Sequence, residues 1–316
     1  MRIAKLFCSY LPPFCKKIMD KIPRGYTSPR KICYTVFMKK INVLAYCKIN
    51  ITLSVGEKDE ERGLHRIDSL MQTIDLHDTV HLSARRDKEC TTNLAWEEGV
   101  EDNALRAAKR FVEAFDTTGV DIVVDKEIPV GKGLGGSSAD AAAVLVGMAI
   151  LYGVDTTEIL PIAAEIGSDV PFLIYRGLAR VGGFGEEIDL LPPLPLMYAL
   201  LVMPKESVAT AEAYEGYDAL GKKPNPVNTD EILSLLRAER NTKIYQCNNF
   251  YGVCSTRCPA IGTATKALQD LRSLHIAMTG TGSCVYALYN RLDYAEEKRD
   301  ALLEAGYDVR LCRFVD

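Results

Sequence analysis

The sequence PVGKGLGGSSAD, residues 129–140, places four glycines within six positions and follows them with two serines. Glycine loses much backbone entropy on folding, so this density indicates a loop that turns through positive φ angles or lies close to a ligand. The free N–H groups of such a loop, followed by the N-terminus of a helix, form an anion-binding site. A plain strand-to-helix turn with a serine cap is the alternative, but it needs fewer glycines. We therefore expect residues 129–139 to bind phosphate.

Two better-known phosphate motifs do not fit this loop. Residues 131–136 match G-x-G-x-x-G, but Pro129 separates them from the preceding apolar run DIVV. Asp155, the acid about 20 residues further on, falls in a predicted loop rather than after a strand. A Walker A loop has a lysine followed by Ser or Thr after its last glycine, whereas Lys132 lies inside the glycine run. The loop alone leaves a kinase and a dehydrogenase open.

The composition narrows the class of protein. The chain has 316 residues, 47% of them hydrophobic and 25% charged, with a formal net charge of −4. Its length suggests one large or two medium domains, and its mild acidity gives no general attraction for nucleic acid or anionic membranes. No apolar run reaches the roughly 18 residues of a membrane helix.

The ten cysteines are irregularly spaced, and the closest pair is Cys254 and Cys258. No second pair and no histidine doublet lies nearby to complete a zinc site. Scattered thiols in a chain of this length fit a reducing compartment better than a disulfide scaffold. We therefore expect a cytoplasmic protein.

Residues 1–37 differ in composition from the rest of the chain. They are rich in Lys and Arg, carry a single acid, and hold four prolines that break any long helix. Two interpretations remain open: an organelle transit segment, or a segment upstream of a true start at Met38. We favour the second, because the sequence from Met38 onward is typical of an opening strand. After this extension, which has no predicted fixed structure, we expect domains over 38–190 and 191–316, with Leu191–Pro195 as linker.

Hydrophobic periodicity predicts the remaining elements. Residues 49–55 alternate between apolar and polar, so a half-buried strand should present Lys48, Asn50, Thr52 and Ser54 on one face, suited to the floor of a cleft or to solvent. Helices are expected at 102–115, 141–150, 157–166 (with a capping box at Asp155 and Glu158) and 229–239. Further strands are expected at 69–82, 121–124, 197–203, 275–289 around a glycine turn, and 307–315. This mixture indicates an α+β protein.

The glycine loop resembles the P-x-x-x-G-L-G-x-S-S-A signature of the GHMP kinases, named for galactokinase, homoserine, mevalonate and phosphomevalonate kinases. Further motifs resemble one branch, the 4-diphosphocytidyl-2-C-methyl-D-erythritol kinases of the methylerythritol phosphate route to isoprenoids. These motifs are A-x-x-K-[IL]-N at 45–50, G-Y-H at 63–65, L-x-D at 76–78, G-x-D-V-P-F at 167–172, R-G-x-A-x-x-x-G-x-G-E at 176–186 and M-[ST]-G-[ST]-G at 278–282. Together they are specific, whereas no single one would be.

The resemblance implies two domains with the active site in the cleft between them, where ATP meets a cytidine diphosphate substrate. It implies that Asp169 is the base for the attacking hydroxyl, and that Lys48 holds Asp169 ionised and polarises that hydroxyl. Without the resemblance, Asp169 would be a helix-end aspartate and Lys48 an edge-strand lysine. Mg²⁺ is expected with ATP, with Ser138 as one candidate ligand. The implied ATP-binding residues are Pro129, Val130, Gly131, Lys132, Gly133, Leu134, Gly135, Gly136, Ser137, Ser138 and Ala139.

The resemblance also implies a set of substrate-binding residues. His65 would hydrogen-bond the cytosine edge and Tyr214 would stack on the base, although a solvated histidine and a core tyrosine are the plain alternatives. Asn50 would contact the substrate. Gly280 and Gly282 would let a strand turn approach the substrate chain, unless they form only a hairpin turn.

Three positions depart from the motifs. Leu64 replaces the tyrosine of G-Y-H, Asn248-Asn249-Phe250-Tyr251 replaces N-D-L-E without either acid, and Lys132 stands where a small residue is usual. These departures bear on substrate contacts more than on phosphoryl transfer. Another GHMP kinase, a nicotinamide-dependent oxidoreductase and a non-catalytic nucleotide sensor are the alternative functions. We expect a monomer or homodimer that acts on a small molecule and binds neither nucleic acid nor membrane.

Overall fold

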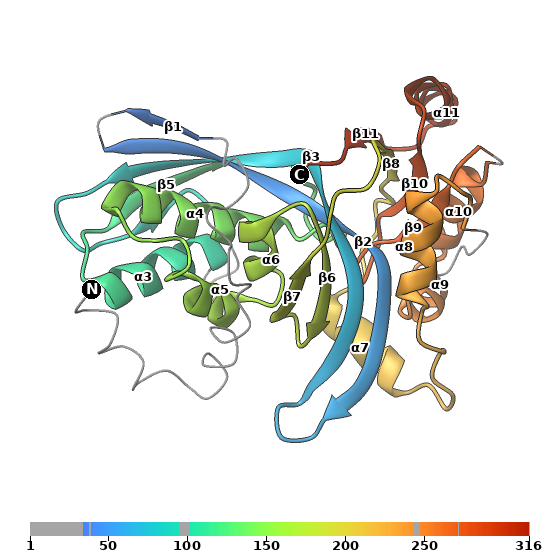
Figure 1. Cartoon of the computed structure of the whole chain (residues 1–316), viewed down its shortest axis with the longest axis horizontal. Coiled ribbons are helices and arrows are strands. Elements are labelled where there is room, and N and C mark those ends of the chain that lie inside the picture. The colour runs from blue at the N-terminus through green and yellow to red at the C-terminus, as the bar shows by residue number, and fades with distance from the viewer. Residues whose placement is uncertain (1–33, 38, 95–101, 243–246, 271, 316) are drawn as a thin grey trace. The chain divides into compact units, whose positions relative to one another are not determined.

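The computed structural model describes residues 34–37, 39–94, 102–242, 247–270 and 272–315. The chain forms two compact units, each assembled from separate segments (Figure 1). The first combines residues up to Ala45 with Thr79–Asp125 and Ser137–Tyr175, and the second combines Tyr46–Asp78, Lys126–Gly136 and Arg176–Asp316.

Segments of the two units alternate along the chain, because two long strands contribute residues to both units. β2 (Lys40–Asp59) and β3 (Leu64–Ala84) pair with each other, and each passes from one unit into the other. The units therefore do not follow the single boundary expected at residue 190. Of the expected extension 1–37, residues 1–33 lie outside the described part, while β1 (Tyr34–Phe37) pairs antiparallel with the start of β2, Phe37 opposite Lys40.

In the first unit the last residues of β3 pair antiparallel with β5 (Val120–Asp125), and β4 (Thr91–Thr92) runs parallel to β5. The helices of this unit are α3 (Asn103–Phe115), α4 (Gly136–Tyr152), α5 (Leu160–Ile166) and α6 (Val170–Tyr175). Because β5 is antiparallel to β3, the glycine loop that follows it does not leave a parallel sheet. The loop therefore lacks the strand context that a dinucleotide fingerprint requires.

Helix α4 is buried on most sides, as its apolar sequence predicts, with Ala139 to Ala149 shielded from solvent. Gly147 permits its close approach to the strands, because a Cβ atom there would lie 2.5 Å from Leu82 Cδ1 and 3.1 Å from Val43 Cγ2. The helix ends at Gly153, whose φ of +70° is the left-handed conformation expected of a glycine stop.

The prediction for the next helix was wrong at its start. Helix α5 begins at Leu160 rather than Thr157, and Pro161 lies in its first turn, where its missing N–H costs nothing. Asp155 does not cap the helix, because its Oδ1 accepts hydrogen bonds from Thr157 N and Oγ1 at 2.8 and 2.7 Å. The sequence between Asp155 and Leu160 thus forms turns, since a local side-chain bond competes with the helix.

The second unit contains an antiparallel sheet in the order β11-β8-β10-β9, formed by β8 (Tyr198–Val202), β9 (His275–Met278), β10 (Val285–Tyr289) and β11 (Val309–Arg313). Val202 lies opposite both Val285 and Val309, so β8 and β10 form the middle of the sheet. The helices of this unit are α7 (Thr210–Asp218), α8 (Thr229–Arg237), α9 (Tyr251–Arg257), α10 (Pro259–Leu268) and α11 (Leu292–Glu304). The apolar faces of α7, α9, α10 and α11 share one core with the sheet, which includes Leu200, Phe250, Ile261, Met278 and Tyr289.

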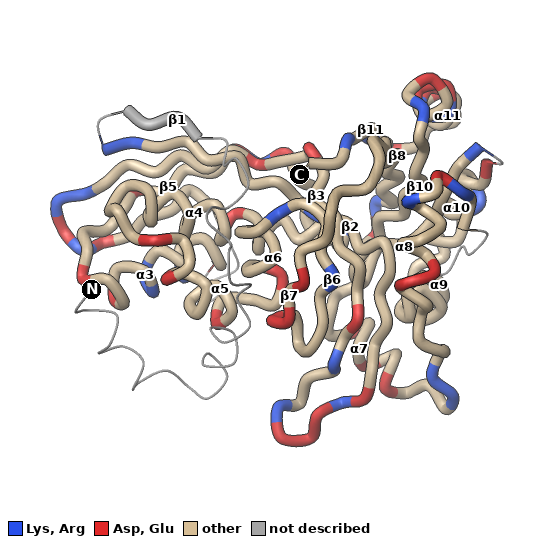
Figure 2. The backbone as a smooth tube through the Cα atoms, viewed as in Figure 1, with Lys and Arg blue, Asp and Glu red and all other residues tan. Residues whose placement is uncertain are grey.

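The same unit contains β6 (Leu178–Gly183) and β7 (Glu187–Leu190), which form a hairpin whose first strand pairs with β3, Met71 opposite Ala179. The charged run Glu57–Arg62 spans the end of β2 and the turn toward β3, and its red and blue segments are visible at the end of the β2–β3 hairpin (Figure 2).

Candidate active site

The glycine loop is fixed at its start by a buried carboxylate from β3. The Asp78 side chain is fully buried, and its Oδ1 accepts hydrogen bonds from Glu127 N at 2.6 Å and Ile128 N at 2.8 Å. Its other oxygen forms an ion pair with Lys126. The L-x-D motif thus holds the two residues ahead of Pro129, and the loop is attached to β3 just where it begins.

The loop then passes against the late glycine turn. Gly133 has a φ of +74°, and a Cβ atom there would lie 2.1 Å from the main-chain oxygen of Thr279. The Thr279 hydroxyl lies 3.1 Å from Gly133 O, and Gly280 and Gly282 also take positive φ angles of 56° and 86°. The two glycine-rich segments are therefore in direct contact, which only residues without side chains allow.

Lys48 and Asn50 lie beside this contact on β2, and both are buried. The Lys48 ammonium donates to Asn50 Oδ1 at 2.6 Å, and the Lys48 main-chain N–H donates to Leu134 O at 3.0 Å. Asn50 Oδ1 also accepts from Gly280 N at 2.9 Å, while its amide group donates to Ser69 Oγ at 2.8 Å. Asn50 therefore joins the lysine, the glycine turn and β3, and the lysine is aimed by neighbours on both sides.

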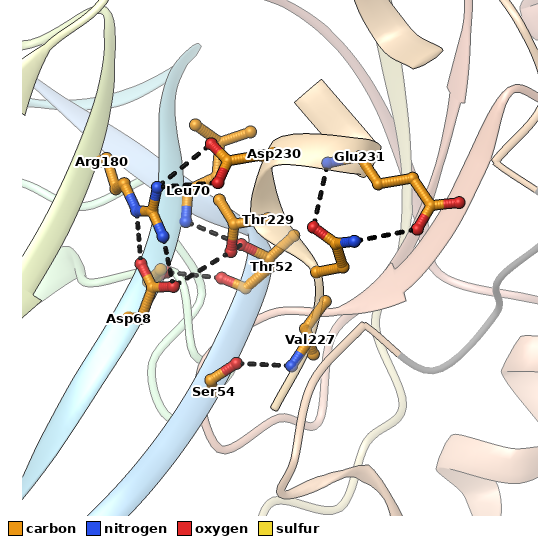
Figure 3. Close-up of polar contacts among 11 residues, drawn as sticks. Thr52, Ser54, Asp68, Leu70, Arg180, Val227, Thr229, Asp230 and Glu231 are labelled. Atoms are coloured by element: carbon orange, nitrogen blue, oxygen red, sulfur yellow. Dashed lines mark hydrogen bonds and ion pairs between the residues drawn. The ribbon is translucent and has the colours of Figure 1, made fainter. Parts of the chain in front are cut away.

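The polar side chains of Thr52 and Ser54 on β2 neither form the floor of a cleft nor face solvent. Thr52 is fully buried, and its hydroxyl lies 3.1 Å from that of Thr229 at the start of α8 (Figure 3). Ser54 Oγ accepts from Val227 N at 2.8 Å. The row beyond Asn50 therefore anchors the N-terminus of α8 to the strand, rather than lining a cavity.

An arginine completes this anchor (Figure 3). Arg180 on β6 donates to both oxygens of Asp68 at 2.8 and 2.9 Å and reaches Asp230 in the first turn of α8 at 3.1 Å. The hydrogen bonds with Asp68 raise the pKa of the Arg180 guanidinium. Strands β3 and β6 and helix α8 are thus held together by the bidentate contact of Arg180 with Asp68 and by its contact with Asp230.

His65 and Tyr214 lie side by side. The rings stack with centroids 5.4 Å apart and 28° between their planes. His65 Nδ1 bonds Gly56 O at 2.9 Å, and Nε2 lies 2.9 Å from Asp218 Oδ1. The Nε2 atom is buried, and Asp218 is its partner at ion-pair distance. Tyr214 is half-buried and packs on Phe250, so it also serves the core.

Lys132 does not point freely from the loop. Its ammonium donates to three successive main-chain oxygens, those of Pro204 at 2.6 Å, Lys205 at 2.9 Å and Glu206 at 3.0 Å. This segment links β8 to α7, the helix that carries Tyr214. The glycine loop is therefore tied to the approach of α7.

In the first unit the serines of the loop open helix α4. Ser138 lies beside the turn that precedes α6, because a Cβ atom at Gly167 would lie 3.8 Å from Ser138 Oγ. Asp169 immediately precedes α6, and its main-chain oxygen accepts from Leu173 N at 3.1 Å. The start of α4 and the G-x-D-V-P-F motif are thus neighbours. Lys48 and Asp169 belong to different compact units, so their pairing stays a prediction.

Among residues 34–37, 39–94, 102–242, 247–270 and 272–315, no group of three or more His, Cys, Asp or Glu side chains is arranged to hold a metal ion. The seven described cysteines are free thiols, and burial raises the pKa of Cys247 to about 12 and of Cys254 to about 11. No described helix is long and apolar enough to span a membrane.

Comparisons with known proteins agree with this geometry. The model for the GHMP kinases N terminal domain matches residues 102–177, and that for the GHMP kinases C terminal domain matches 233–308. The 4-diphosphocytidyl-2-C-methyl-D-erythritol kinase of Alkaliphilus oremlandii is 33% identical over 84% of this chain and 93% of its own length. That of Moorella thermoacetica is 38% identical over 79% and 90%. The chain belongs to this kinase family.

Solved structures support the assignment. A crystal structure of a 4-(cytidine 5'-diphospho)-2C-methyl-D-erythritol kinase matches with a TM-score of 0.74 and 28% identity, over 87% of this chain and 99% of that one. A homoserine kinase from Cytophaga hutchinsonii has a TM-score of 0.64 at 17% identity, over 90% and 97%, and shares the fold. Membership of the kinase family decides against the nicotinamide-dependent oxidoreductase. It also confirms the two-domain α+β fold of a GHMP kinase.

Sequence reasoning missed several residues that shape this kinase's site. Asn248, noted only as a departure from N-D-L-E, donates to Met278 O at 2.8 Å and to Gly280 O at 2.7 Å, so it holds the glycine turn in place. The neighbouring Asn249 accepts from Val55 N at 2.9 Å. Asp218 was missed because nothing in its local sequence indicates that it meets His65. Leu64, the departure in G-Y-H, is 53% exposed. The rings that pack against His65 are those of Tyr214 and Tyr217.

Proposed function

We propose that this kinase transfers the γ-phosphoryl group of ATP to the 2-hydroxyl of 4-diphosphocytidyl-2-C-methyl-D-erythritol, giving ADP and the 2-phosphate. The observation that carries the proposal is the contact between the glycine loop and Lys48. Its backbone bonds Leu134 in the loop, and its ammonium is fixed by Asn50. A cation is thereby held beside a phosphate-binding loop, and phosphoryl transfer requires this kind of charge neutralisation.

Each residue then has a chemical task. Asp169 takes the proton of the 2-hydroxyl, the hydroxyl oxygen forms a bond to the γ-phosphorus, and the bond from that phosphorus to the β,γ-bridging oxygen breaks, leaving ADP. Lys48 stabilises the carboxylate and the developing charge. N–H groups of residues 130–136 and of the first turn of α4 contact the ATP phosphates.

The substrate's cytosine is assigned to the His65 pocket. Gly56 O can only accept, so Nδ1 of His65 carries a hydrogen and fixes the ring. Nε2 lies 2.9 Å from Asp218 Oδ1, so His65 and Asp218 together form the polar edge offered to the base. Tyr214 presents its ring next to it. Gly280 and Gly282 admit the substrate chain near Asn50.

Mg²⁺ would arrive with the nucleotide. The described residues offer no cluster of protein ligands, and Mg²⁺ in kinases is often held by substrate phosphates and water with one or two protein groups. We propose Ser138, at the start of α4, as one protein ligand. We further propose that the protein works in the cytoplasm, because its described thiols are unpaired, as a reducing compartment keeps them.

The test is turnover by three purified proteins. Wild type should phosphorylate the cytidine substrate at its 2-hydroxyl, as ³¹P NMR of the product would show. Lys48→Ala and Asp169→Asn should each lose at least about a hundredfold in kcat while keeping the wild-type melting temperature. Near-normal kcat in Asp169→Asn would remove the role given to that carboxylate.

A further inference from the structure

The Lys132 ammonium lies in a cage of main-chain oxygens. It donates to Pro204 O at 2.6 Å, Lys205 O at 2.9 Å and Glu206 O at 3.0 Å, and Ser283 Oγ lies 3.5 Å away. An ammonium group has three donors and no acceptor, so three converging carbonyls use its full capacity. A lysine that bound phosphate would instead point its ammonium N–H groups at the phosphate.

Ser283 shows that the cage is built rather than incidental. The residue is fully buried, and its hydroxyl donates to Glu206 O at 2.5 Å, beside the lysine. The Lys132 main-chain oxygen accepts from Cys284 N at 3.3 Å. One residue of the glycine loop is therefore fixed by its backbone to the late glycine turn and by its side chain to the segment Pro204–Glu206.

Successive carbonyl oxygens that face one point repel one another and require a positive charge between them. Proteins meet this requirement with a bound cation, as when carbonyl rings replace the hydration shell of K⁺. Lysine is a compact point charge with three rotatable donors, and it matches such a set of oxygens better than the flat fork of arginine does.

We propose that Lys132 is a built-in monovalent cation, which holds the phosphate loop on the segment Pro204–Glu206 and so positions the loop's N–H groups for ATP. Its side chain is a positioning group, not a phosphate ligand. The link to ATP rests on the proposed function, whereas the cation-like role of the side chain does not. Because this segment leads into α7 and Tyr214, the same tether connects the ATP loop to the wall of the cytosine pocket.

The experiment measures ATP affinity by isothermal titration calorimetry, and melting temperature, in potassium chloride and in choline chloride at equal ionic strength. Wild type should bind ATP equally in both salts. Lys132→Ala, which empties the cage, should bind at least about tenfold more weakly in choline, because the loop loses charged hydrogen bonds. Potassium or ammonium should restore most of that loss and raise the melting temperature of this variant alone.

Two further variants separate the proposal from a general loss of packing. Lys132→Met fills the cage without a charge, so it should bind ATP weakly in either salt. Lys222→Ala removes an exposed lysine of the same unit and should match wild type in both salts. If Lys132→Ala does not fold, wild-type affinity in Lys132→Met would overturn the proposal.

The proposal also fails if Lys132→Ala binds ATP like wild type in choline, or if neither potassium nor ammonium changes its affinity or its melting temperature. If wild type does not bind ATP at all, the proposed function fails instead. The salt dependence of the melting temperature of Lys132→Ala then still decides whether the lysine replaces a cation.

Discussion

Asn50 Oδ1 accepts a 2.6 Å hydrogen bond from the Lys48 ammonium, and both residues are buried on the same face of β2. The same oxygen accepts from Gly280 N at 2.9 Å. The charged donor that we propose for the phosphoryl transfer is thus aimed by an amide that also holds the glycine turn. The position of Lys48 depends on this amide, because a lysine side chain has many rotamers and is fixed only by its contacts.

Asn50→Ala should therefore act on turnover more than on substrate binding. Removing the amide frees the ammonium and the glycine turn, and the loss of about 1.5–3 kcal/mol corresponds to a fall in kcat of about ten- to a hundredfold. Steady-state kinetics with both substrates would measure it. Asn42→Ala, which removes an asparagine of the same strand in the other unit, is the matched control and should keep kcat within about twofold. An Asn50→Ala enzyme with normal kcat would contradict the role of the amide.

Asp78→Ala should destabilise the protein at the start of the loop. The carboxylate is fully buried and accepts from Glu127 N and Ile128 N, so its removal takes the acceptor from two main-chain donors and breaks the ion pair with Lys126. The free energy of unfolding should fall by about 3 kcal/mol. Urea denaturation measures this. The control Asp125→Asn alters a carboxylate that is 70% exposed and paired with His81, and it should change the free energy by less than about 0.5 kcal/mol. Equal effects of the two variants would refute the anchoring role.

Two alanine substitutions in the loop form a matched pair. Gly131 and Gly133 have φ angles of +70° and +74°, so alanine is strained at both by about 1–2 kcal/mol. Only at Gly133 does the new Cβ atom meet backbone, 2.1 Å from Thr279 O, whereas at Gly131 the nearest atom is Ser207 Cβ at 3.4 Å. Gly133→Ala should abolish measurable ATP binding, and Gly131→Ala should weaken it by about tenfold or less. Calorimetric titration with ATP would measure the affinity of both variants. Tighter ATP binding by Gly133→Ala than by Gly131→Ala would contradict this geometry.

His275 gives the protein a predictable pH dependence of stability. Burial lowers the pKa of this histidine from 6.5 to about 4, while its Nε2 bonds Ile51 O at 3.0 Å. Below about pH 6.5 the imidazole of His275 is protonated in the unfolded chain but stays mostly neutral in the folded protein. The free energy of unfolding therefore falls as the pH drops from 6.5 toward 4. At about pH 5 the free energy of unfolding should be roughly 2 kcal/mol lower than near neutrality on account of this residue.

The variant His275→Gln isolates that contribution, because glutamine keeps a donor for Ile51 O and does not titrate. Urea unfolding at about pH 7 and about pH 5 should show a smaller pH dependence in the variant than in wild type. An identical slope in wild type and His275→Gln would show that the buried histidine does not control it.

Much of the fold was predictable because its elements carry local signals. The alternation at 49–55, the helical face of 102–115 and the apolar run after the glycine loop correspond to β2, α3 and α4. Asp102 caps α3 through Leu105 N at 2.8 Å, as an acid before a helix suggests. The start of α5 was not predictable in this way, because Asp155 satisfies Thr157 locally and removes its own capping role.

Only part of the candidate site could be predicted from the sequence. Motifs indicated which residues matter, but they did not show what holds them. Asn50 meets Thr279 and Gly280 across more than two hundred residues of chain, and Lys132 meets Pro204–Glu206 across more than seventy. Such contacts depend on how distant strands pack, and no local pattern encodes them. The interpretation of the β2 polar row failed for the same reason, since α8 covers Thr52 and Ser54.

The most direct test of the central claim is an ADP-release assay over a panel of alcohols that includes 4-diphosphocytidyl-2-C-methyl-D-erythritol, mevalonate and homoserine. The account predicts ATP-dependent turnover with the cytidine substrate, with kcat/KM at least about a thousandfold above the other two, because only that substrate has a base for the His65 pocket. Comparable or higher kcat/KM with mevalonate or homoserine, or no ADP release with the cytidine substrate, would contradict it.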